Sequence, residues 1–428
     1  MDNFGDFKLV KILRQIPQRR TVYIANDDKD TFILKVFYFK NEYLNELNGS
    51  FLLQSSNVLT PKLLKFGKQN KKYFIVYEYI KNSINLEEYF NTSQKLLIKK
   101  IISKIYNINK ILYQSNIIQK DNYLKNYLIS KNKIYIIDGG MVKKIKYFSN
   151  LRKLINFALL QSKIDPTLLF SKHDLFKSSI AVILQEYFRH FFLNKGIHHY
   201  FKKTLRTSSE FFKESSSSKL ILKRRNFYFK FDDMDNFLMK SEILKNGNTC
   251  TVFHNKDMII KRYNIKNMLH FLAQQIKKPR GLNSWQVANV LKLLNIPTAT
   301  PYFYYEKRFL FFRLESYFAM SYEDSENIKD FESRLITKES RRNFSEKLTR
   351  LFKKLRFYRF IHGDLKYTNI LVNNKNDNIF LIDFDKSFFS KYQYIYNHKI
   401  QKQLNRFYSN WKPSSDLVAT LKKMENKI

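Results

Sequence analysis

The pattern that decides the fold is HGDLKYTNILVNNKNDNIFLIDFD, residues 362–385. Asp364 is followed five residues later by Asn369, and two short apolar stretches joined by polar turn residues then lead to Asp383. We predict a loop and a hairpin that together present two carboxylates and one amide. An aspartate that receives the proton of a hydroxyl, with an amide and a second aspartate as oxygen ligands for Mg²⁺, forms the catalytic half of a phosphotransferase site.

A weaker copy of this pattern lies earlier in the chain. Asp121 and Asn126 keep the five-residue spacing, and the apolar run that follows ends at Asp138. The His-Gly pair that opens the later copy is replaced here by Gln119 and Lys120. The copy predicts a second loop-and-hairpin of the same kind.

Two apolar strands each carry one lysine upstream of these loops. Lys35 lies in the run 31–37 and Lys261 ends the run 258–261. A lysine inside an apolar strand is either an edge residue with its ammonium group in water, or the phosphate-anchoring lysine of a kinase small lobe. Glu46, in the helical segment after the first run, could pair with Lys35. Gly247, with small hydroxyl residues after it, could fold over phosphates, and an ordinary hairpin turn alone would explain it nearly as well. The strand with Lys261 follows at the right distance, which favours the phosphate-binding role.

These features recur in the same order at nearly constant separations, which indicates an internal repeat. The separations are 226 positions from Lys35 to Lys261, 243 from Asp121 to Asp364 and 245 from Asp138 to Asp383. We therefore predict an α+β protein of two tandem protein-kinase-like modules, each with a β-rich small lobe and a helical large lobe. The expected bounds are 1–210 for the first module, 211–222 for a Ser-rich linker and 223–428 for the second.

Composition limits the possible partners. The 428 residues carry a formal charge of +40, a field that attracts anions such as nucleic acid, acidic lipid headgroups or a polyanionic glycan, unless the lysines reflect compositional drift alone. A single cysteine, Cys250, excludes disulfides and fits a reducing compartment. The apolar run 96–113 is interrupted by lysines, so we expect a core helix and not a membrane span. The polar residues 1–6 do not resemble a secretory signal.

Several segments resemble a known family. HGDLKYTNILV and LIDFD, together with residues 261–264, 278–285 and 294–301, look like the bacterial lipopolysaccharide kinase family, the Kdo/WaaP and InaA-like group. This resemblance covers roughly residues 240–390. More faintly, FILKVF at 32–37, the loop 121–127 and YIIDGG at 135–140 resemble the lipopolysaccharide core heptose kinases of the RfaY type.

The resemblance implies an ATP- and Mg²⁺-dependent kinase that phosphorylates Kdo or heptose hydroxyls of the lipopolysaccharide inner core. Lys261 would hold the α- and β-phosphates, and Asp364 would orient and deprotonate the sugar hydroxyl. Asn369 and Asp383 would bind Mg²⁺, and Lys366 would neutralise charge on the transferring phosphoryl group.

In the first module, the resemblance implies that Lys35 and Glu46 bind the nucleotide and that Asp121 is catalytic. It also implies that Asn126 and Asp138 bind the metal. The implied partners are the lipid A–core oligosaccharide and the anionic surface of the inner membrane. The protein would be cytoplasmic and peripheral to that membrane, without nucleic acid or a structural metal.

Two departures from the kinase pattern stand out in the second module. Ser284 or its neighbours occupy the helix where many kinases place a glutamate that pairs with the lysine, and Asp385 replaces the glycine of D-F-G. The first module lacks an evident glycine loop near residues 15–20, so it is either a working kinase or a degenerate partner that binds and positions.

Other functions share part of the pattern. A small-molecule phosphotransferase would also contain H-G-D-x-x-x-x-N, and a protein kinase would contain the same loop but normally an A-P-E-like segment after Asp383. A nucleic-acid-binding protein would explain the charge, although no recognition motif supports it. A first-module pseudokinase that regulates the second module, or a scaffold without catalysis, also stays open.

Overall fold

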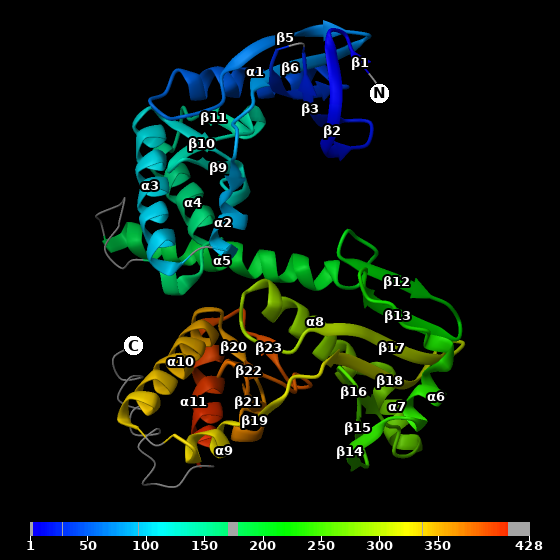
Figure 1. Ribbon diagram of the computed structural model, residues 1–428. Helices are drawn as coiled ribbons and strands as arrows, with labels where there is room; N and C mark the ends of the chain where they lie inside the picture. Colours follow the sequence, from blue (N-terminus) through cyan, green and yellow to red (C-terminus); the bar gives the residue numbers. More distant parts are fainter. Residues whose placement is uncertain (1–2, 28, 93, 170–178, 336, 410–428) are drawn as a thin grey trace. The chain divides into compact units, whose positions relative to one another are not determined.

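The computed structural model describes residues 3–27, 29–92, 94–169, 179–335 and 337–409. The chain divides into two compact units, Met1–Leu193 and Asn194–Ile428. Both contain helices and strands, so the protein is α+β (Figure 1). The boundary lies inside helix α5 (Ser179–Lys203), 17 positions before the predicted one at residue 210 (210 − 193).

The first unit opens with an antiparallel six-stranded sheet in the order β1-β2-β3-β4-β6-β5. Its strands are β1 (Asn3–Phe4), β2 (Phe7–Ile16), β3 (Arg20–Asn26), β4 (Thr31–Phe37), β5 (Leu63–Gln69) and β6 (Lys72–Glu78). Helix α1 (Lys40–Gln54) packs on β4 and β6 (Figure 1). Because side chains alternate along a strand, Leu34 and Val36 face one apolar cluster while Ile33 and Phe37 face another with Leu47 of α1. Lys35 shares the second face.

Helices and two small sheets complete the first unit. The helices are α2 (Leu86–Thr92), α3 (Lys95–Gln114), α4 (Ser149–Gln161), the first part of α5 and the 3₁₀ turns η1 (Leu124–Asn126), η2 (Gly139–Met141) and η3 (Pro166–Leu168). One sheet has the order β10-β9-β7 and the other pairs β11 with β8. Their strands are β7 (Ile84–Asn85), β8 (Ile117–Gln119), β9 (Tyr127–Ser130), β10 (Lys133–Ile136) and β11 (Val142–Lys144). The predicted core helix is present as α3, whose Ile98, Ile102 and Ile105 are buried.

The second unit carries a larger antiparallel sheet of seven strands, in the order β12-β13-β17-β18-β16-β15-β14. The strands are β12 (Phe211–Ser215), β13 (Lys219–Arg224), β14 (Glu242–Gly247), β15 (Cys250–Asn255), β16 (Met258–Tyr263), β17 (Pro301–Phe309) and β18 (Phe312–Ser321). The turn η4 (Phe231–Asp233) and the helices α6 (Met234–Met239), α7 (Met268–Ile276) and α8 (Arg280–Leu293) belong with it, and α8 packs on β16, β17 and β18.

The predicted Ser-rich linker at 211–222 is not a linker. These residues form the hairpin β12–β13, and β13 also pairs with β17. Phe211, Ile221 and Leu222 are buried there, and the serines form the turn, where the Ser216 N–H donates to the carbonyl oxygen of Lys219 over 2.9 Å. A polar run of serines is equally compatible with a tight turn and a flexible joint, and the pairing of β13 with β17 shows that a turn forms here.

The remainder of the second unit repeats the small-sheet arrangement of the first. One sheet has the order β19-β21-β22 and another pairs β20 with β23. The strands are β19 (Ser325–Asn327), β20 (Phe360–Ile361), β21 (Ile370–Asn373), β22 (Ile379–Leu381) and β23 (Phe388–Phe389); the helices are α9 (Ile328–Ser333), α10 (Lys338–Phe357), α11 (Gln393–Ser409) and the 3₁₀ turn η5 (Tyr367–Asn369). None of the helices in the described part of the chain is both long and apolar enough to cross a membrane.

Candidate active site

The lysine of the second unit projects from β16 toward the loop after β22. Lys261 is buried, and its Nζ lies 3.0 Å from Oδ1 of Asp383. Burial disfavours the charged ammonium group, but the carboxylates of Asp383 and Asp385 outweigh burial and raise the pKa of Lys261. Burial likewise disfavours the Asp383 carboxylate, but the neighbouring Lys261 outweighs it and lowers the pKa of Asp383. The pair therefore holds opposite charges in a site mostly shielded from water.

The loop–hairpin predicted from the sequence brings Asp364 and Asn369 to the same place. Asn369 Nδ2 donates to the carbonyl oxygen of Asp364 over 2.8 Å, and the Ile382 N–H donates to the carbonyl oxygen of Asn369 over 3.1 Å. Asp383 has φ +69°, in the left-handed region that aspartate tolerates better than most residues. These bonds fix the Asn369 side chain with its amide nitrogen toward the Asp364 backbone.

The carboxylate of Asp364 lies between two cations. Arg406 of α11 places Nη2 2.7 Å from Oδ1, and Lys366 places Nζ 3.5 Å from Oδ2. Lys366 was one of the residues that the sequence predicted for the catalytic site, and its role toward the phosphoryl group stays a prediction. Arg406 was not among them, because it lies 42 positions away (406 − 364) in a helix that carries no recognisable motif.

The histidine of HGD supports the backbone of the loop. His362 is fully buried, and its Nε2 lies 2.9 Å from the carbonyl oxygen of Ile382. Burial lowers the pKa of His362, so its ring is neutral at pH 7 and Nε2 carries the hydrogen that the carbonyl accepts. Gly363 has φ +79°, and a Cβ there would lie 2.5 Å from the carbonyl oxygen of Lys386, so glycine is required.

Asp385 occupies the centre of a cluster that links α8 to the loop after β22. Its carboxylate accepts hydrogen bonds from Tyr263 Oη at 2.7 Å and Ser284 Oγ at 2.9 Å. Arg280 adds two more, from Nε at 3.0 Å and from Nη2 at 2.7 Å. Burial disfavours the Arg280 cation, yet the Asp385 carboxylate outweighs it and raises the pKa of Arg280. In the second unit a carboxylate from the loop after β22 thus binds α8, and it also helps to raise the pKa of Lys261.

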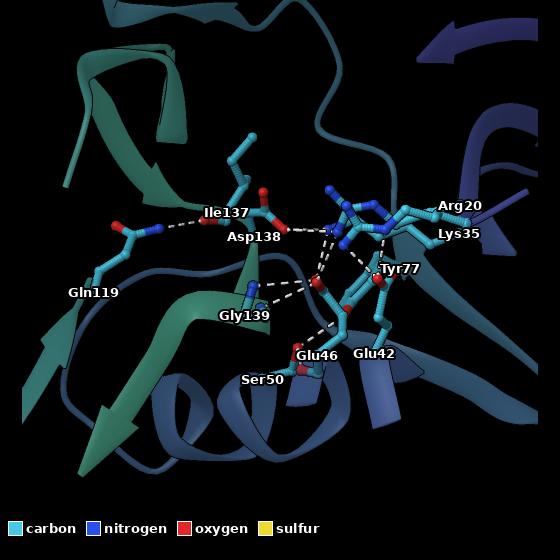
Figure 2. Close-up of polar contacts among 12 residues, drawn as sticks. Arg20, Lys35, Glu42, Glu46, Ser50, Tyr77, Gln119, Ile137, Asp138 and Gly139 are labelled. Carbon is cyan, nitrogen blue, oxygen red and sulfur yellow. Dashed lines mark hydrogen bonds and ion pairs between the residues drawn. The ribbon is translucent and has the colours of Figure 1, made fainter. Parts of the chain in front are cut away.

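In the first unit the carboxylate comes from the helix, as the sequence predicted (Figure 2). Lys35 Nζ lies 2.5 Å from Oε1 of Glu46 and 3.4 Å from Oδ1 of Asp138. Glu46 is fully buried and also accepts the backbone N–H groups of Gly139 at 3.1 Å and Gly140 at 3.0 Å. Burial disfavours the Lys35 ammonium group, and the Glu46 and Asp138 carboxylates outweigh it and raise the pKa of Lys35.

A second cation, which the sequence analysis did not identify, enters this first site from β3. Arg20 Nη1 lies 3.3 Å from Oδ1 of Asp138 and 3.4 Å from Oε2 of Glu46 (Figure 2). Asp138 is thus held by two cations, with Lys35 as the second, and they lower its pKa below the usual range. No motif marks Arg20 in the sequence, so the pattern gave no signal for it.

Asp121 and Asn126 take the same backbone arrangement as their later counterparts. Asn126 Nδ2 donates to the carbonyl oxygen of Asp121 over 2.7 Å, and the Ile137 N–H donates to the carbonyl oxygen of Asn126 over 2.9 Å. Gln119 Nε2 donates to the carbonyl oxygen of Ile137 over 2.8 Å, which is the bond that the histidine makes in the second unit. Burial, with a contribution from Asp138, raises the pKa of Asp121 to about 6.

A cavity of about 390 Å³ adjoins this first site. Apolar side chains from β2, β3 and β4 line it, together with Lys35, Asp138 and the segment 78–80 after β6. An apolar slot that ends at a lysine and an aspartate has the chemistry to hold a planar base at one end and phosphates at the other. In the second unit, Gly247 lies in the hairpin β14–β15 and its carbonyl oxygen accepts from Asn264 Nδ2 over 3.1 Å; a role toward phosphates stays a prediction.

The two sites therefore share a backbone geometry as well as a sequence pattern. The residue before each last aspartate makes the same two backbone hydrogen bonds, one through its N–H and one through its carbonyl oxygen, and both aspartates have φ +69°. The separation of the corresponding residues is 243 positions for 119 and 362, 121 and 364, and 126 and 369, and 245 positions for 138 and 383.

A comparison with protein families matches most of the second unit. Residues 241–422 match the lipopolysaccharide kinase (Kdo/WaaP) family. This match confirms the resemblance drawn from residues 240–390, and it supports an ATP-dependent kinase as the enzyme class. A search of curated proteins finds no match to the chain.

Three solved structures are similar at low identity. WaaP in complex with acyl carrier protein is 14% identical with a TM-score of 0.31, over 44% of this chain and 83% of that one. The kinase domain of PknI from Mycobacterium tuberculosis is 12% identical with a TM-score of 0.30, over 38% of this chain and 74% of that one. A Cydia pomonella granulovirus kinase is 15% identical with a TM-score of 0.31, over 43% of this chain and 88% of that one.

Proposed function

We propose that the second unit transfers the γ-phosphoryl group of ATP to a sugar hydroxyl, Kdo or heptose, of the lipopolysaccharide inner core. The observation that carries the proposal is the 3.0 Å contact between Lys261 Nζ and Asp383, beside a loop in which Asn369 is bonded to the Asp364 backbone. One lysine from the sheet thus meets the aspartate that follows the hairpin, and the hairpin is joined to the loop that carries Asp364 and Asn369. A kinase needs that set, because its catalysis is mainly positioning and charge stabilisation.

The donor set fits Mg²⁺. Asn369 donates through its nitrogen to the Asp364 backbone, so its Oδ1 is the atom left for a cation, and Asp383 adds a carboxylate oxygen. Mg²⁺ prefers oxygen ligands and needs few from the protein when phosphates supply the others. The ion would neutralise charge on the phosphates.

The remaining roles belong to the protein's own side chains. Lys261 would hold the α- and β-phosphates, and Asp364 would orient the sugar hydroxyl and accept its proton. Arg406 pairs with Asp364 and fixes the direction of its carboxylate, while Lys366 lies where it can meet negative charge on the transferring group.

The substrate proposal extends to the membrane. Lipid A–core oligosaccharide is an anionic, lipid-anchored acceptor, and the formal charge of +40 favours association with it and with an anionic leaflet. We therefore place the enzyme at the cytoplasmic face of the inner membrane as a peripheral protein. A small-molecule or protein acceptor is the alternative for the same site.

For the first unit, we propose a second kinase-like module that binds nucleotide. The cavity beside Lys35 and the Lys35–Glu46 ion pair support binding. Arg20 favours a regulatory role without catalysis, because it neutralises the Asp138 carboxylate that a catalytic metal would use. Nucleotide would then bind here without Mg²⁺, and Arg20→Gln would make binding more dependent on Mg²⁺ in a fluorescent ATP-analogue titration with and without chelator.

The test of the main proposal is a pair of isosteric variants. Asp364→Asn should abolish phosphate transfer while the fold is kept, because it removes a base without removing volume. Asp121→Asn should remove a second phosphorylation if the first unit is also active. The products are read by mass spectrometry of the inner core from cells that express each variant in place of the native chain.

An exposed aspartate supplies the matched control. Asp235 lies on α6, its side chain is 65% exposed and it pairs with Lys307, so Asp235→Asn should leave the products unchanged. Native-like turnover by Asp364→Asn would defeat the proposal for the second unit.

A further inference from the structure

Helix α7 of the second unit presents an apolar face that the described residues of its own unit leave largely exposed. The helix has no buried residue, although Met268, Leu269, Leu272 and Ile276 recur at the spacing of one helical face. The side chain of Ile276 is 89% exposed. Asn267 caps the first turn by accepting the N–H of His270 over 2.9 Å, so the segment is a defined helix.

The tip of the hairpin β17–β18 is apolar as well. Phe309 pairs with Phe312, and the two residues between them, Leu310 and Phe311, form the turn. Turns of this length favour asparagine and glycine because they require positive φ, yet Leu310 holds φ +54° here. Phe311 is 94% exposed. Bulky apolar residues at a strained, exposed turn bury little area within the fold, so they indicate a surface that contacts another molecule.

Direct contacts join the helix to the hairpin. The Phe271 and Phe312 rings lie 5.8 Å apart between centroids. Gln275 binds both backbone groups of Arg313, accepting its N–H over 2.8 Å and donating to its carbonyl oxygen over 3.0 Å. Met268, Leu269, Leu272 and Ile276 together with Phe309–Phe312 therefore form one surface, here named the α7–hairpin surface.

Basic side chains border this surface. Lys277, Lys278, Arg308 and Arg313 line an adjoining hollow of about 360 Å³. Residues 265–282 and 307–314 include seven lysines and arginines and no acidic residue. The one carboxylate in the hollow, Glu306, is already bonded to Arg308 at 2.7 Å. The hollow therefore offers cationic side chains beside the projecting apolar ones.

We propose that the α7–hairpin surface docks the second unit onto an anionic lipid bilayer. Its apolar side chains would enter the interfacial region while the lysines and arginines meet the acidic headgroups. Ile276 lies at the edge of the hollow, whereas the other apolar groups of the surface are absent from its lining and project from a helix and a turn. This arrangement favours insertion into a fluid interface over a socket for one protein segment. The hollow is also lined by Pro279, next to Arg280 of the Asp385 cluster, so docking would hold the proposed active site near lipid-anchored acceptors.

The test is vesicle co-sedimentation of the full chain without ATP. We expect binding to vesicles of phosphatidylcholine with phosphatidylglycerol, and little to phosphatidylcholine alone. The double change Ile276→Ser and Phe311→Ser should weaken binding about tenfold or more, because each side chain contributes several buried carbon atoms. Tyr394→Ser on α11, a second largely exposed side chain, is the matched control and should bind as the native chain does.

Two further measurements keep the outcomes distinct. In Phe311→Trp, brominated lipid should quench the new indole if the turn inserts. Phosphorylation of a lipid-free sugar acceptor should be unaffected by the two Ser substitutions. If the proposed function is wrong, this assay shows no transfer even by the native chain; if the docking surface is wrong, the sedimentation assay shows no difference between the native chain and the double variant. Equal binding by the double variant, equal binding to neutral vesicles, or loss of self-association in place of lipid binding would each overturn the inference.

Discussion

The cluster around Asp385 lends itself to a quantitative test by Asp385→Asn, which keeps the side-chain volume and removes the charge. The carboxylate accepts four hydrogen bonds from three side chains, and Arg280 supplies two of them. Hydrogen bonds to a charged group contribute roughly 1.5–3 kcal/mol each, and an amide keeps only one acceptor oxygen. Two bonds are therefore lost, and the Arg280 cation loses its partner.

The loss must be reduced for solvent, because the Arg280 side chain is 40% exposed and water can replace part of the ion pair. Breaking a fully buried pair costs about 3–5 kcal/mol. We therefore expect Asp385→Asn to lower the free energy of unfolding of the second unit by about 2–3 kcal/mol.

Urea unfolding followed by the fluorescence of Trp285 measures this quantity. Trp285 is fully buried in α8, one residue after Ser284, so its signal reports on the second unit; the other tryptophan, Trp411, lies outside the described residues. Asp235→Asn removes an exposed aspartate paired with Lys307 and should cost less than about 1 kcal/mol. An equal, small loss in both variants would refute the reasoning.

Three other changes test the first unit and the loop. Burial raises the pKa of Asp121 to about 6 and so favours its protonated form in the folded state; the resulting stabilisation is full below pH 3.8 and is lost as the pH rises through 6. Catalysis needs the ionised form, so the rate of any phosphate transfer by the first unit should decrease when the pH is lowered below 6. A pH–rate profile of the Asp364→Asn protein measures this rate. Gly49→Ala places a Cβ 1.8 Å from a backbone oxygen of the loop after β10 and should cost about 2–3 kcal/mol in circular-dichroism unfolding, while Gly67→Ala meets only ordinary contacts and should cost less than about 1 kcal/mol. His362→Gln should keep phosphate transfer within about tenfold of the native rate, because the amide of a glutamine makes the corresponding bond in the first unit; a loss as large as that of His362→Ala would contradict the equivalence.

The sequence was sufficient for features that depend on local spacing. The Asp364–Asn369 loop needs only a 3₁₀ turn and a strand, and both are encoded within a few residues. Strand alternation placed Lys35 on the face of the sheet that meets α1, so its pairing with Glu46 could be predicted. Each of these relations spans fewer than a dozen positions.

The sequence was insufficient where partners are distant or where one residue type has two uses. Arg280 binds Asp385, which lies 105 positions later in the chain. Arg406, which pairs with Asp364, lies in α11, a helix whose sequence contains no recognisable motif. The serines 215–218 were interpreted as a linker because serine suits flexible joints and turns alike. Only the pairing of β13 with β17, which is a tertiary contact, distinguishes the two.

The position of one carboxylate connects these observations. In the first unit Glu46 comes from the helix and receives the N–H groups of the loop, whereas in the second unit Asp385 comes from the loop and receives the hydroxyl of Ser284. Both arrangements tie the helix to the loop and leave a carboxylate near the lysine. The absence of the helix glutamate from the second unit is therefore a poor guide to lost function, because the Asp385 carboxylate supplies negative charge from the loop. Arg20 differs in kind, since it adds a cation that no residue of the motif supplies, and it bears directly on metal use. Whether the first unit transfers phosphate thus depends on the affinity of Asp138 for Mg²⁺ in the presence of Arg20. It depends little on Gln119, which makes the same bond to the loop as His362 does.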